Sequence, residues 1–206
     1  MNEVRAVRRP RRTKPHRPNE LFAAAAAEFA AKGFAATRIA DVAQRVGLRS
    51  RGSVYRHFDS KEAMHRALLD DLLDIWLAPL RAMNPEGDPR AEIMGYMRRK
   101  LQMSRDFPRE SRLFANEVLQ GVPRLQEEIS VDLKALVDDR AALIRRWIAA
   151  GKLAVVDPYH LIFSIWALTQ HYADFDAQIR MIRGDRDPMH GAEGFLEGLF
   201  ERLLQP

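Results

Sequence analysis

The chain has 206 residues, carries a net charge of +5 and contains no cysteine. Without cysteine, disulfide bonds, zinc fingers with thiolate ligands and thiol catalysis are excluded. No apolar run reaches the roughly 18 residues that a membrane-spanning helix needs. The basic N-terminus is not followed by the apolar core of a secretory signal. The sequence therefore predicts a cytoplasmic protein without a membrane span, built as one helical domain or as a small domain fused to a medium one.

The positive charge is concentrated in the first 60 residues. Residues 1–18 carry seven Arg or Lys residues against one Glu, whereas residues 61–206 carry 20 positive and 23 negative side chains. A basic head on a mildly acidic body favours contact with a polyanion. The alternative is that residues 1–17, which are rich in Arg and Pro, form a disordered tail with solvated charges. Composition alone leaves both interpretations open.

Apolar residues recur at helical spacing through the rest of the chain, and alternation with period two is rare. This pattern predicts an all-α fold of about nine helices, separated by Gly and Pro. Gly33 is expected to end the first helix, Thr37 to cap the second, Ser50 to cap the third and Pro79 to stop the fourth. The expected helices cover residues 19–32, 38–46, 50–57, 60–77, 90–105, 109–119, 124–150, 159–182 and 191–204.

The second and third of these helices have the features of a helix-turn-helix: IADVAQRVG, a turn, then SRGSVYRHF. Ala43 is small enough for two helices to cross closely, and Gly47 permits the backbone angles of a tight turn. The second of the pair would present hydrogen-bonding side chains of the kind that read the major groove. These are Ser50, Arg51, Ser53, Arg56 and His57.

Residues 19–64 resemble the DNA-binding head of the TetR family of bacterial transcription repressors. The resemblance is carried, in this order, by Phe29, Gly33, Phe34, Thr37, Ile39, Ala43, Gly47, Ser50, Gly52, Tyr55, Phe58, Lys61 and Glu62. It implies a dimeric repressor that binds a palindromic operator in double-stranded DNA. It implies phosphate contacts from Thr37, Tyr55 and Lys61, and base contacts from residues 50–56. The predicted DNA-binding residues are Thr37, Arg49, Ser50, Arg51, Gly52, Ser53, Tyr55, Arg56, His57 and Lys61.

One feature departs from the family pattern. Ser50 follows the turn glycine Gly47 by three positions, one more than usual, so the longer turn changes how the next segment enters the groove and the operator sequence is not carried over. Simpler interpretations also stay open: Tyr55 as a core aromatic, and Arg51 and Arg56 as solvated charges. Arg49 and the tail would then add only salt-sensitive affinity, or the tail would enter a minor groove.

Three segments of the body resemble the pyrimidine-utilisation (Rut-type) branch of the same family: DIWLAPL (74–80), KLQMSRDFPRESRLFANE (100–117) and DPYHLIFSIWALTQHYADF (157–175). The similarity extends over about residues 19–183. It implies a small effector related to uracil and thymine. The third segment would suit such a ring, because Trp166 can stack on it and the Gln170 amide offers both a donor and an acceptor.

The predicted effector site draws on several helices, and an aromatic stripe at helical spacing is also what an ordinary core requires. His160 and His171 lie eleven residues apart and supply too few ligands for a metal, so neither a metal nor a cofactor is expected. The predicted effector-binding residues are Trp76, Met103, Phe114, Asn116, Glu117, Trp147, Phe163, Trp166, Thr169 and Gln170.

The segments 159–182 and 191–204 are expected to form the homodimer as a four-helix bundle, unless the second packs only on its own body. The last helix has a broad apolar face made by Phe195, Leu196, Leu199, Phe200 and Leu203. The proposed division is a disordered tail (1–17), a DNA-binding domain (18–64) and an effector-binding and dimerisation domain (65–206).

The expected mechanism is release of the operator when effector binding moves helix 60–77 and changes the spacing of the two heads. Two rival functions use the same fold: a repressor that responds to a purine or an aromatic acid, and a DNA-binding regulator without an effector. An enzyme that uses Glu117, His160 and His171 for acid–base chemistry is disfavoured, because no nucleophile motif, phosphate loop or metal cluster accompanies them.

Overall fold

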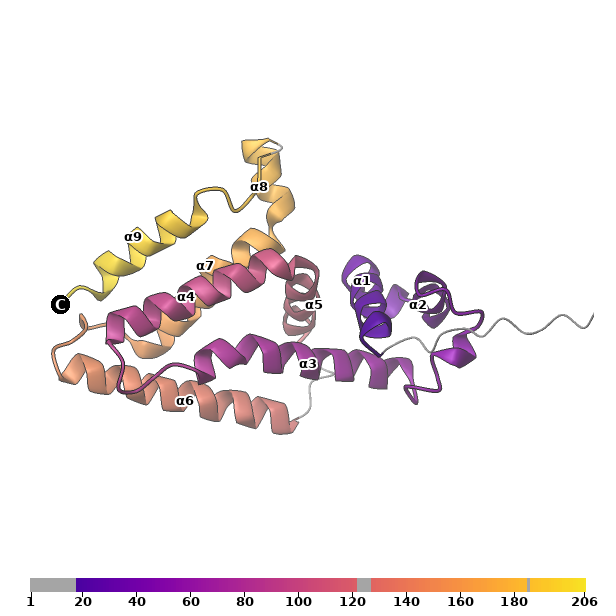
Figure 1. Cartoon of the computed structure of the whole chain (residues 1–206), viewed down its shortest axis with the longest axis horizontal. Helices are drawn as coiled ribbons and strands as arrows, with labels where there is room; N and C mark the ends of the chain where they lie inside the picture. Colours follow the sequence, from indigo (N-terminus) through magenta and orange to yellow (C-terminus); the bar gives the residue numbers. More distant parts are fainter. Residues whose placement is uncertain (1–17, 122–126, 185) are drawn as a thin grey trace, which may run out of the picture.

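The computed structural model describes residues 18–121, 127–184 and 186–206, and within these ranges it contains nine α-helices, one short 3₁₀ turn and no strand (Figure 1). The predicted all-α fold is therefore confirmed. The predicted tail, residues 1–17, and the first three residues of the predicted helix 124–150 lie outside the described residues. Within the described residues no helix is long and apolar enough to cross a membrane.

The head and the body share one long helix, α3, which runs without a break from one into the other (Figure 1). The other head elements, α1, α2 and the 3₁₀ turn, lie around the first half of α3. Of the remaining six helices, the three that follow α3 along the chain pack against it, and the last two lie on the far side of the body from it (Figure 1). The elements are α1 (Pro18–Ala36), α2 (Ile39–Arg45), the 3₁₀ turn (Arg51–Ser53), α3 (Lys61–Arg81), α4 (Pro89–Asp106), α5 (Pro108–Leu119), α6 (Glu127–Ala149), α7 (Pro158–Asp174), α8 (Asp176–Arg183) and α9 (Ala192–Leu204).

Side-chain caps explain where three of the helices begin. Asp88 and Asp157 each stand before a proline at the first helical position, and their carboxylates accept the backbone N–H three residues further on. Ser60 caps α3 in the same way, because its hydroxyl oxygen accepts the N–H of Ala63 at 3.0 Å. Such caps satisfy backbone donors that have no partner inside the helix. The starts predicted for these helices agree with the structure to within a residue or two.

The predicted cap of the second helix is wrong, whereas the first unbroken helical stretch does end at Gly33, as predicted. Gly33 has φ 73°, which kinks α1, but helical structure resumes beyond it and continues to Ala36. Thr37 does not cap α2, since the capping position is Arg38. The Thr37 hydroxyl instead donates back to the carbonyl oxygens of Gly33 at 2.8 Å and of Glu28 at 3.1 Å. The Thr37 hydroxyl therefore stabilises the kink at Gly33 and does not cap α2.

The predicted third helix, residues 50–57, is not an α-helix. Arg51–Ser53 form a 3₁₀ turn and residues 54–57 form further turns. The backbone N–H groups of Ser53 and Val54 bond to carbonyls three residues earlier, and the Ser50 side chain makes no capping bond. A short segment that contains Gly52 and lacks a cap has little to drive an α-helix.

Two further boundaries differ from the prediction. Pro79 lies inside α3 and is buried, rather than stopping the helix. Pro79 has no N–H to donate to the carbonyl of Ile75, and the helix ends two residues after it, at Arg81. The predicted helix 159–182 breaks at Phe175 into α7 and α8. There Arg112 of α5 donates to the carbonyl oxygen of Ala173, which a continuous helix would have used for its own ladder.

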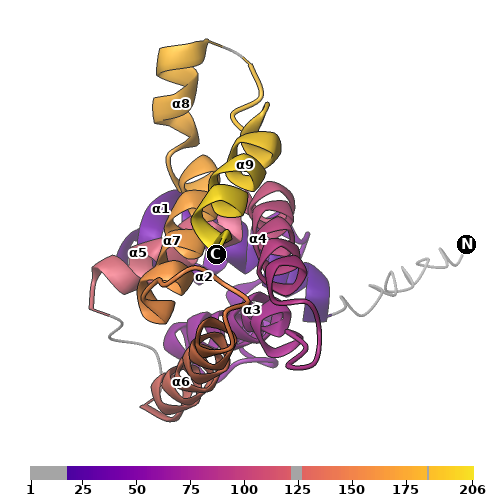
Figure 2. The same cartoon turned by 90° about the vertical axis from the view of Figure 1, so that its left-hand side faces the viewer.

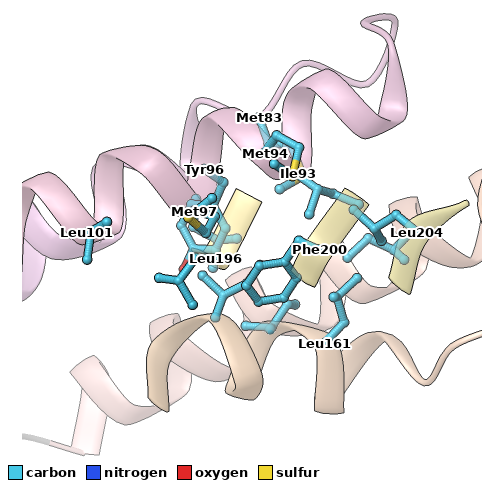
Figure 3. Packing of buried hydrophobic residues seen from close by; sticks show 14 of the residues in the cluster. Met83, Ile93, Met94, Tyr96, Met97, Leu101, Leu161, Leu196, Phe200 and Leu204 are labelled. Carbon is cyan, nitrogen blue, oxygen red and sulfur yellow. The ribbon is translucent and has the colours of Figure 1, made fainter. Parts of the chain in front are cut away.

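Two hydrophobic clusters form the core. The body cluster joins α4, α6, α7 and α9, and Figure 3 shows Leu196, Phe200 and Leu204 of α9 pointing into it. Part of the apolar face predicted for the dimer therefore packs on its own body. Phe195 and Leu203 remain exposed. α8 projects away from the body beside α9, and none of its residues is buried (Figure 2).

Candidate DNA-binding head and effector site

The segment from Arg49 to His57 presents its polar side chains to solvent at the outer end of the head. Val54 is fully buried and anchors the segment in the head core. Seven of the ten predicted DNA-binding residues are exposed here, and Ser53 is half-buried. A buried anchor with polar neighbours is the arrangement that a groove-reading segment needs. The exposed residues are Arg49, Ser50, Arg51, Gly52, Tyr55, Arg56 and His57.

The other two predicted DNA-binding residues hold the head together. The Thr37 side chain is buried and committed to the two backbone carbonyls described above. Lys61 Nζ donates to the carbonyl oxygen of Ala35 at 3.2 Å and lies 4.5 Å from the centre of the Phe34 ring. Lys61 therefore ties the start of α3 to the end of α1. It is half-buried.

Ion pairs occupy two of the head's other cations. The Glu28 carboxylate is buried and pairs with Lys32 and Arg45, each at 2.7 Å. Hydrogen bonds from Lys32, and then from Arg45, hold the pKa of Glu28 below its usual value. Lys32 also pairs with Asp41 on α2 at 2.7 Å. This network fastens α1 to α2, so that the two helices hold the segment Arg49–His57 in place.

In the body, Trp76 of α3 lies between an aromatic ring and a cation. Its ring centre is 6.1 Å from that of Phe114 on α5, and Lys100 Nζ of α4 lies 4.3 Å from it. Lys100 is buried, and this burial lowers the pKa of Lys100 to about 8. The attraction of Asp174 acts in the opposite direction but is weaker. Buried lysines are rare because the charged form loses its hydration. A buried cation with a lowered pKa beside aromatic rings is a candidate for a functional site.

Helices α4 and α7 lie side by side and face each other with polar residues at four-residue intervals (Figure 1). Residues four apart share a helix face. On α4 these are Tyr96, Lys100 and Ser104, and on α7 they are Trp166, Gln170 and Asp174. At one end the indole N–H of Trp166 donates to the Tyr96 hydroxyl. At the other the Ser111 hydroxyl of α5 donates to the Asp174 carboxylate. We use the name α4–α7 polar seam for these six residues of α4 and α7 together with Trp76 of α3.

The predicted effector residues do not all meet at one place. Trp76 and Phe114 are in contact, and Phe163 packs on Trp166 with ring centres 5.6 Å apart. Trp147 is part of the body core. The Thr169 hydroxyl is buried and donates to the carbonyl oxygens of Ile165 and Trp166. Met103 and Gln170 are half-buried.

Asn116 and Glu117 line a different space, a cavity of about 180 Å³ between head and body. Its walls come from α1, α3 and α5, with Phe29 and His65 on the head side and Leu113 on the body side. The seam and this cavity are therefore two separate places to which the predicted effector residues belong. Among the described residues no group of three or more His, Asp or Glu side chains is placed to hold a metal ion.

The prediction missed Lys100, Ser104, Ser111 and Asp174. A signal for two of them was present in the sequence. Lys100 and Ser104 continue the buried face of α4 that Ile93 and Met97 begin. A charged residue at a position where helical spacing requires an apolar one points to a functional site.

Two models of protein families match consecutive parts of the chain. Residues 21–68 match bacterial regulatory proteins of the tetR family, and residues 69–205 match the YcdC-like protein, C-terminal region. The HTH-type transcriptional regulator RutR of Escherichia coli (strain K12) is 48% identical over 164 residues, which cover 80% of this chain and 77% of RutR. The HTH-type transcriptional repressor KstR2 of Rhodococcus jostii is 41% identical over 81 residues, 39% of each protein.

Solved structures share the fold. The ketosteroid transcriptional regulator KstR2 of Mycobacterium tuberculosis matches with a TM-score of 0.71 over 94% of this chain and 98% of its own, at 21% sequence identity. PfmR of Thermus thermophilus, a TetR family transcriptional regulator, matches with a TM-score of 0.63 over 93% of this chain and 97% of its own, at 26% identity. These relatives are transcription regulators rather than enzymes, and regulators of this kind bind operator DNA as dimers with small-molecule effectors. The chain is a DNA-binding transcription repressor that belongs to the TetR family.

Proposed function

We propose that this repressor leaves its operator when its body binds a pyrimidine such as uracil or thymine. The observation that carries the proposal is that the similarity to RutR extends over 80% of the chain, well beyond the head. The body segments that resemble the pyrimidine-utilisation branch supply Trp76, Lys100, Gln170 and Asp174 to the α4–α7 polar seam. A small ring with polar edges fits such surroundings.

The operator would be read by the exposed segment Arg49–His57. Arg51 and Arg56 would face base edges or phosphates, and the Tyr55 hydroxyl would contact a phosphate. Thr37 and Lys61 would act at the edge of the same surface, where the backbone they fasten meets the DNA. An operator-binding protein acts where the chromosome lies, so we also assign it to the cytoplasm.

The homodimer would form through α7, α8 and α9. Large apolar side chains stay exposed on these helices: Phe163 on α7, Met181 and Ile182 on α8, and Phe195 and Leu203 on α9. Exposed apolar side chains grouped on adjoining helices are typical of an interface between copies. Two copies would present two heads to the two half-sites of a palindrome. The tail and the head would then be residues 1–17 and 18–64, with residues 65–206 as the body.

The test measures effector binding and operator binding on the same preparation. Uracil, thymine, hypoxanthine and benzoate are titrated into the full chain by calorimetry. The operator is selected from random double-stranded DNA, and its affinity is measured by fluorescence anisotropy with and without each compound. We expect saturable binding of uracil or thymine at one site per subunit, together with weaker operator binding.

Three results would contradict this proposal in different ways. Binding and release by hypoxanthine or benzoate alone would assign the protein to another effector class. Operator binding that no compound changes would instead favour a regulator without an effector. A pyrimidine that tightens operator binding would reverse the direction of regulation proposed here.

A further inference from the structure

Two buried polar atoms in or beside the α4–α7 polar seam lack the hydrogen-bond partners that burial normally requires, and the buried residue Lys100 lies with them. The indole Nε1 of Trp76 and the hydroxyl of Ser104 are buried and have no hydrogen-bond partner. Within the described residues Lys100 Nζ has the Trp76 ring and the longer-range attraction of Asp174, but no direct ion pair or hydrogen bond. Native proteins satisfy nearly all such groups, so each exception needs an explanation.

All three groups are donors that come together from two helices. Lys100 and Ser104 are four residues apart on the buried face of α4, and the Lys100 ammonium lies over the Trp76 ring of α3. An indole N–H and an ammonium can only donate, and a serine hydroxyl can donate as well. What is missing from this place is therefore a group that accepts hydrogen bonds.

An acceptor also lies within electrostatic reach of Lys100. Asp174 of α7 is half-buried, accepts one hydrogen bond from Ser111, and burial raises its pKa. The second carboxylate oxygen of Asp174 keeps free acceptor capacity, since an ionised carboxylate can accept about four hydrogen bonds. The seam thus offers several donors and one acceptor.

The charges decide which kind of ligand fits. Lys100 and Asp174 offset each other, and Arg112, which also acts on Asp174, is paired with Asp176. A ligand with its own full charge would upset that balance. An aromatic carboxylate would form an ion pair with Lys100, but it would be repelled by the carboxylate of Asp174. A neutral ring that carries both carbonyl oxygens and a ring N–H matches donors and acceptor together. Its flat face would suit the aromatic rings of Trp76 and Phe114.

We propose that the α4–α7 polar seam binds a neutral planar cyclic amide or imide, with a ring carbonyl accepting from Lys100 and Ser104 and a ring N–H donating to Asp174. The inference rests on the proposed function, because it names the chemistry by which the same body recognises its effector. It adds Lys100, Ser104 and Asp174, which the resemblance to the family did not supply.

The first experiment compares probes on the full wild-type chain by calorimetry. Uracil has carbonyls and ring N–H groups, 1,3-dimethyluracil keeps the carbonyls but has no N–H, and benzoate is a planar anion. We expect uracil to bind, and 1,3-dimethyluracil and benzoate to bind at least tenfold more weakly. Equal binding of uracil and 1,3-dimethyluracil would remove the role of Asp174. Preference for benzoate would overturn the neutral-ligand assignment.

The second experiment tests the residues, with a matched control on the same helix. We expect Lys100→Met to weaken uracil binding at least tenfold, and Ser104→Ala and Asp174→Asn to weaken it several-fold. Arg99→Met removes an exposed cation from the other side of α4 and should leave binding unchanged. Circular dichroism and thermal unfolding show that each variant is folded. If Lys100→Met were unfolded, Ser104→Ala and Asp174→Asn would decide.

The outcomes separate the two proposals. If the wild type binds hypoxanthine, a purine amide, and not uracil, and Lys100→Met abolishes that binding, the pyrimidine assignment fails while the seam stands. If the wild type binds uracil and Lys100→Met, Ser104→Ala and Asp174→Asn bind it equally well, the seam fails while the pyrimidine effector stands. If none of uracil, thymine and hypoxanthine binds, both proposals fail.

Discussion

Leu113 of body helix α5 and Phe29 of head helix α1 belong to one hydrophobic cluster and line one cavity. Leu113 thus completes the core of the head although it lies far along the chain in the body. Two residues earlier, the Ser111 hydroxyl bonds to Asp174 at the end of α7. Helix α5 therefore contacts both the α4–α7 polar seam and the head, so the proposed effector site would have a direct connection to the DNA-binding part.

The first prediction follows from this connection. Leu113→Ala should lower the free energy of unfolding by about 2–5 kcal/mol, because it removes a buried side chain and leaves a cavity. Uracil should still bind, but the ratio of operator affinities measured without and with uracil should fall toward one. Urea unfolding and anisotropy measure the two effects. Val118→Ala, at an exposed position on the same helix, is the control. An unchanged ratio in a folded Leu113→Ala protein would contradict transmission through α5.

The second prediction concerns the stability cost of Lys100. Its pKa falls from 10.5 to about 8, so below pH 8 the protein keeps a buried charge that the unfolded chain would hydrate. A shift of this size corresponds to at most about 3 kcal/mol. Lys100→Met should therefore raise the unfolding free energy at pH 7, even though it weakens effector binding. Urea unfolding at pH 7 measures this, with Arg99→Met as the control.

The pH dependence of Lys100 has a definite sign. Between pH 8 and 10.5 the unfolded chain still holds the Lys100 proton while the folded protein has lost it, so stability from this group rises with pH. The advantage of Lys100→Met over the wild type should accordingly shrink from about pH 7 to about pH 10. A constant or growing advantage over that range would show that burial does not lower the pKa of Lys100 in the folded protein.

The third prediction concerns the exposed segment Arg49–His57. Arg51→Ala and Arg56→Ala should each weaken operator binding by about 1–3 kcal/mol where the side chain contacts a base. A side chain that contacts only a phosphate should instead lower the salt dependence by about one released counterion and affect all sequences alike. Anisotropy titrations at several salt concentrations distinguish the two roles. Arg146→Ala removes an exposed cation from α6 and should change neither quantity.

The fourth prediction concerns assembly. Phe195 is 60% exposed and Met181 80% exposed, on α9 and α8. A charge at an apolar interface would have to be buried without a partner, so Phe195→Asp with Met181→Asp should convert the dimer to a monomer. Light scattering after size-exclusion chromatography measures the mass. Val155→Asp, at a residue that is 91% exposed between α6 and α7, should leave the dimer intact. A dimer that survives the double change would place the interface elsewhere.

Much of the fold could be predicted from residues that act locally. The Asp-Pro pairs at Asp88 and Asp157 mark helix starts because the cap and the proline need nothing beyond the next turn. The break at Phe175 could not be predicted in this way, since it depends on Arg112 reaching from another helix to the Ala173 carbonyl. Helical periodicity describes one helix at a time and contains no information about such a contact.

The candidate site was only partly predictable for the same reason. Trp76 and Phe114 were expected to help form one site, and their rings are indeed in contact. Asn116 and Glu117 were assigned to it as well, but they line the cavity at the head. On α5 the residue that contacts Trp76, Phe114, is only two or three positions from the residues that line the cavity, Asn116 and Glu117. Which side of α5 faces the seam and which faces the head is decided by tertiary packing.

The position of Leu113 also limits how regulators of this kind can be recombined. A chimaera joined between residues 68 and 69, where the two family models meet, would carry the whole of α1 from one parent and the whole of α5 from another. Its α3 would be continuous, yet the surface between α1 and α5 would be mismatched at Leu113 and Phe29. A new operator preference is therefore better introduced by replacing the exposed residues among 49–57 alone, which keeps the buried anchor Val54 and the packing of α1 on α5 in place.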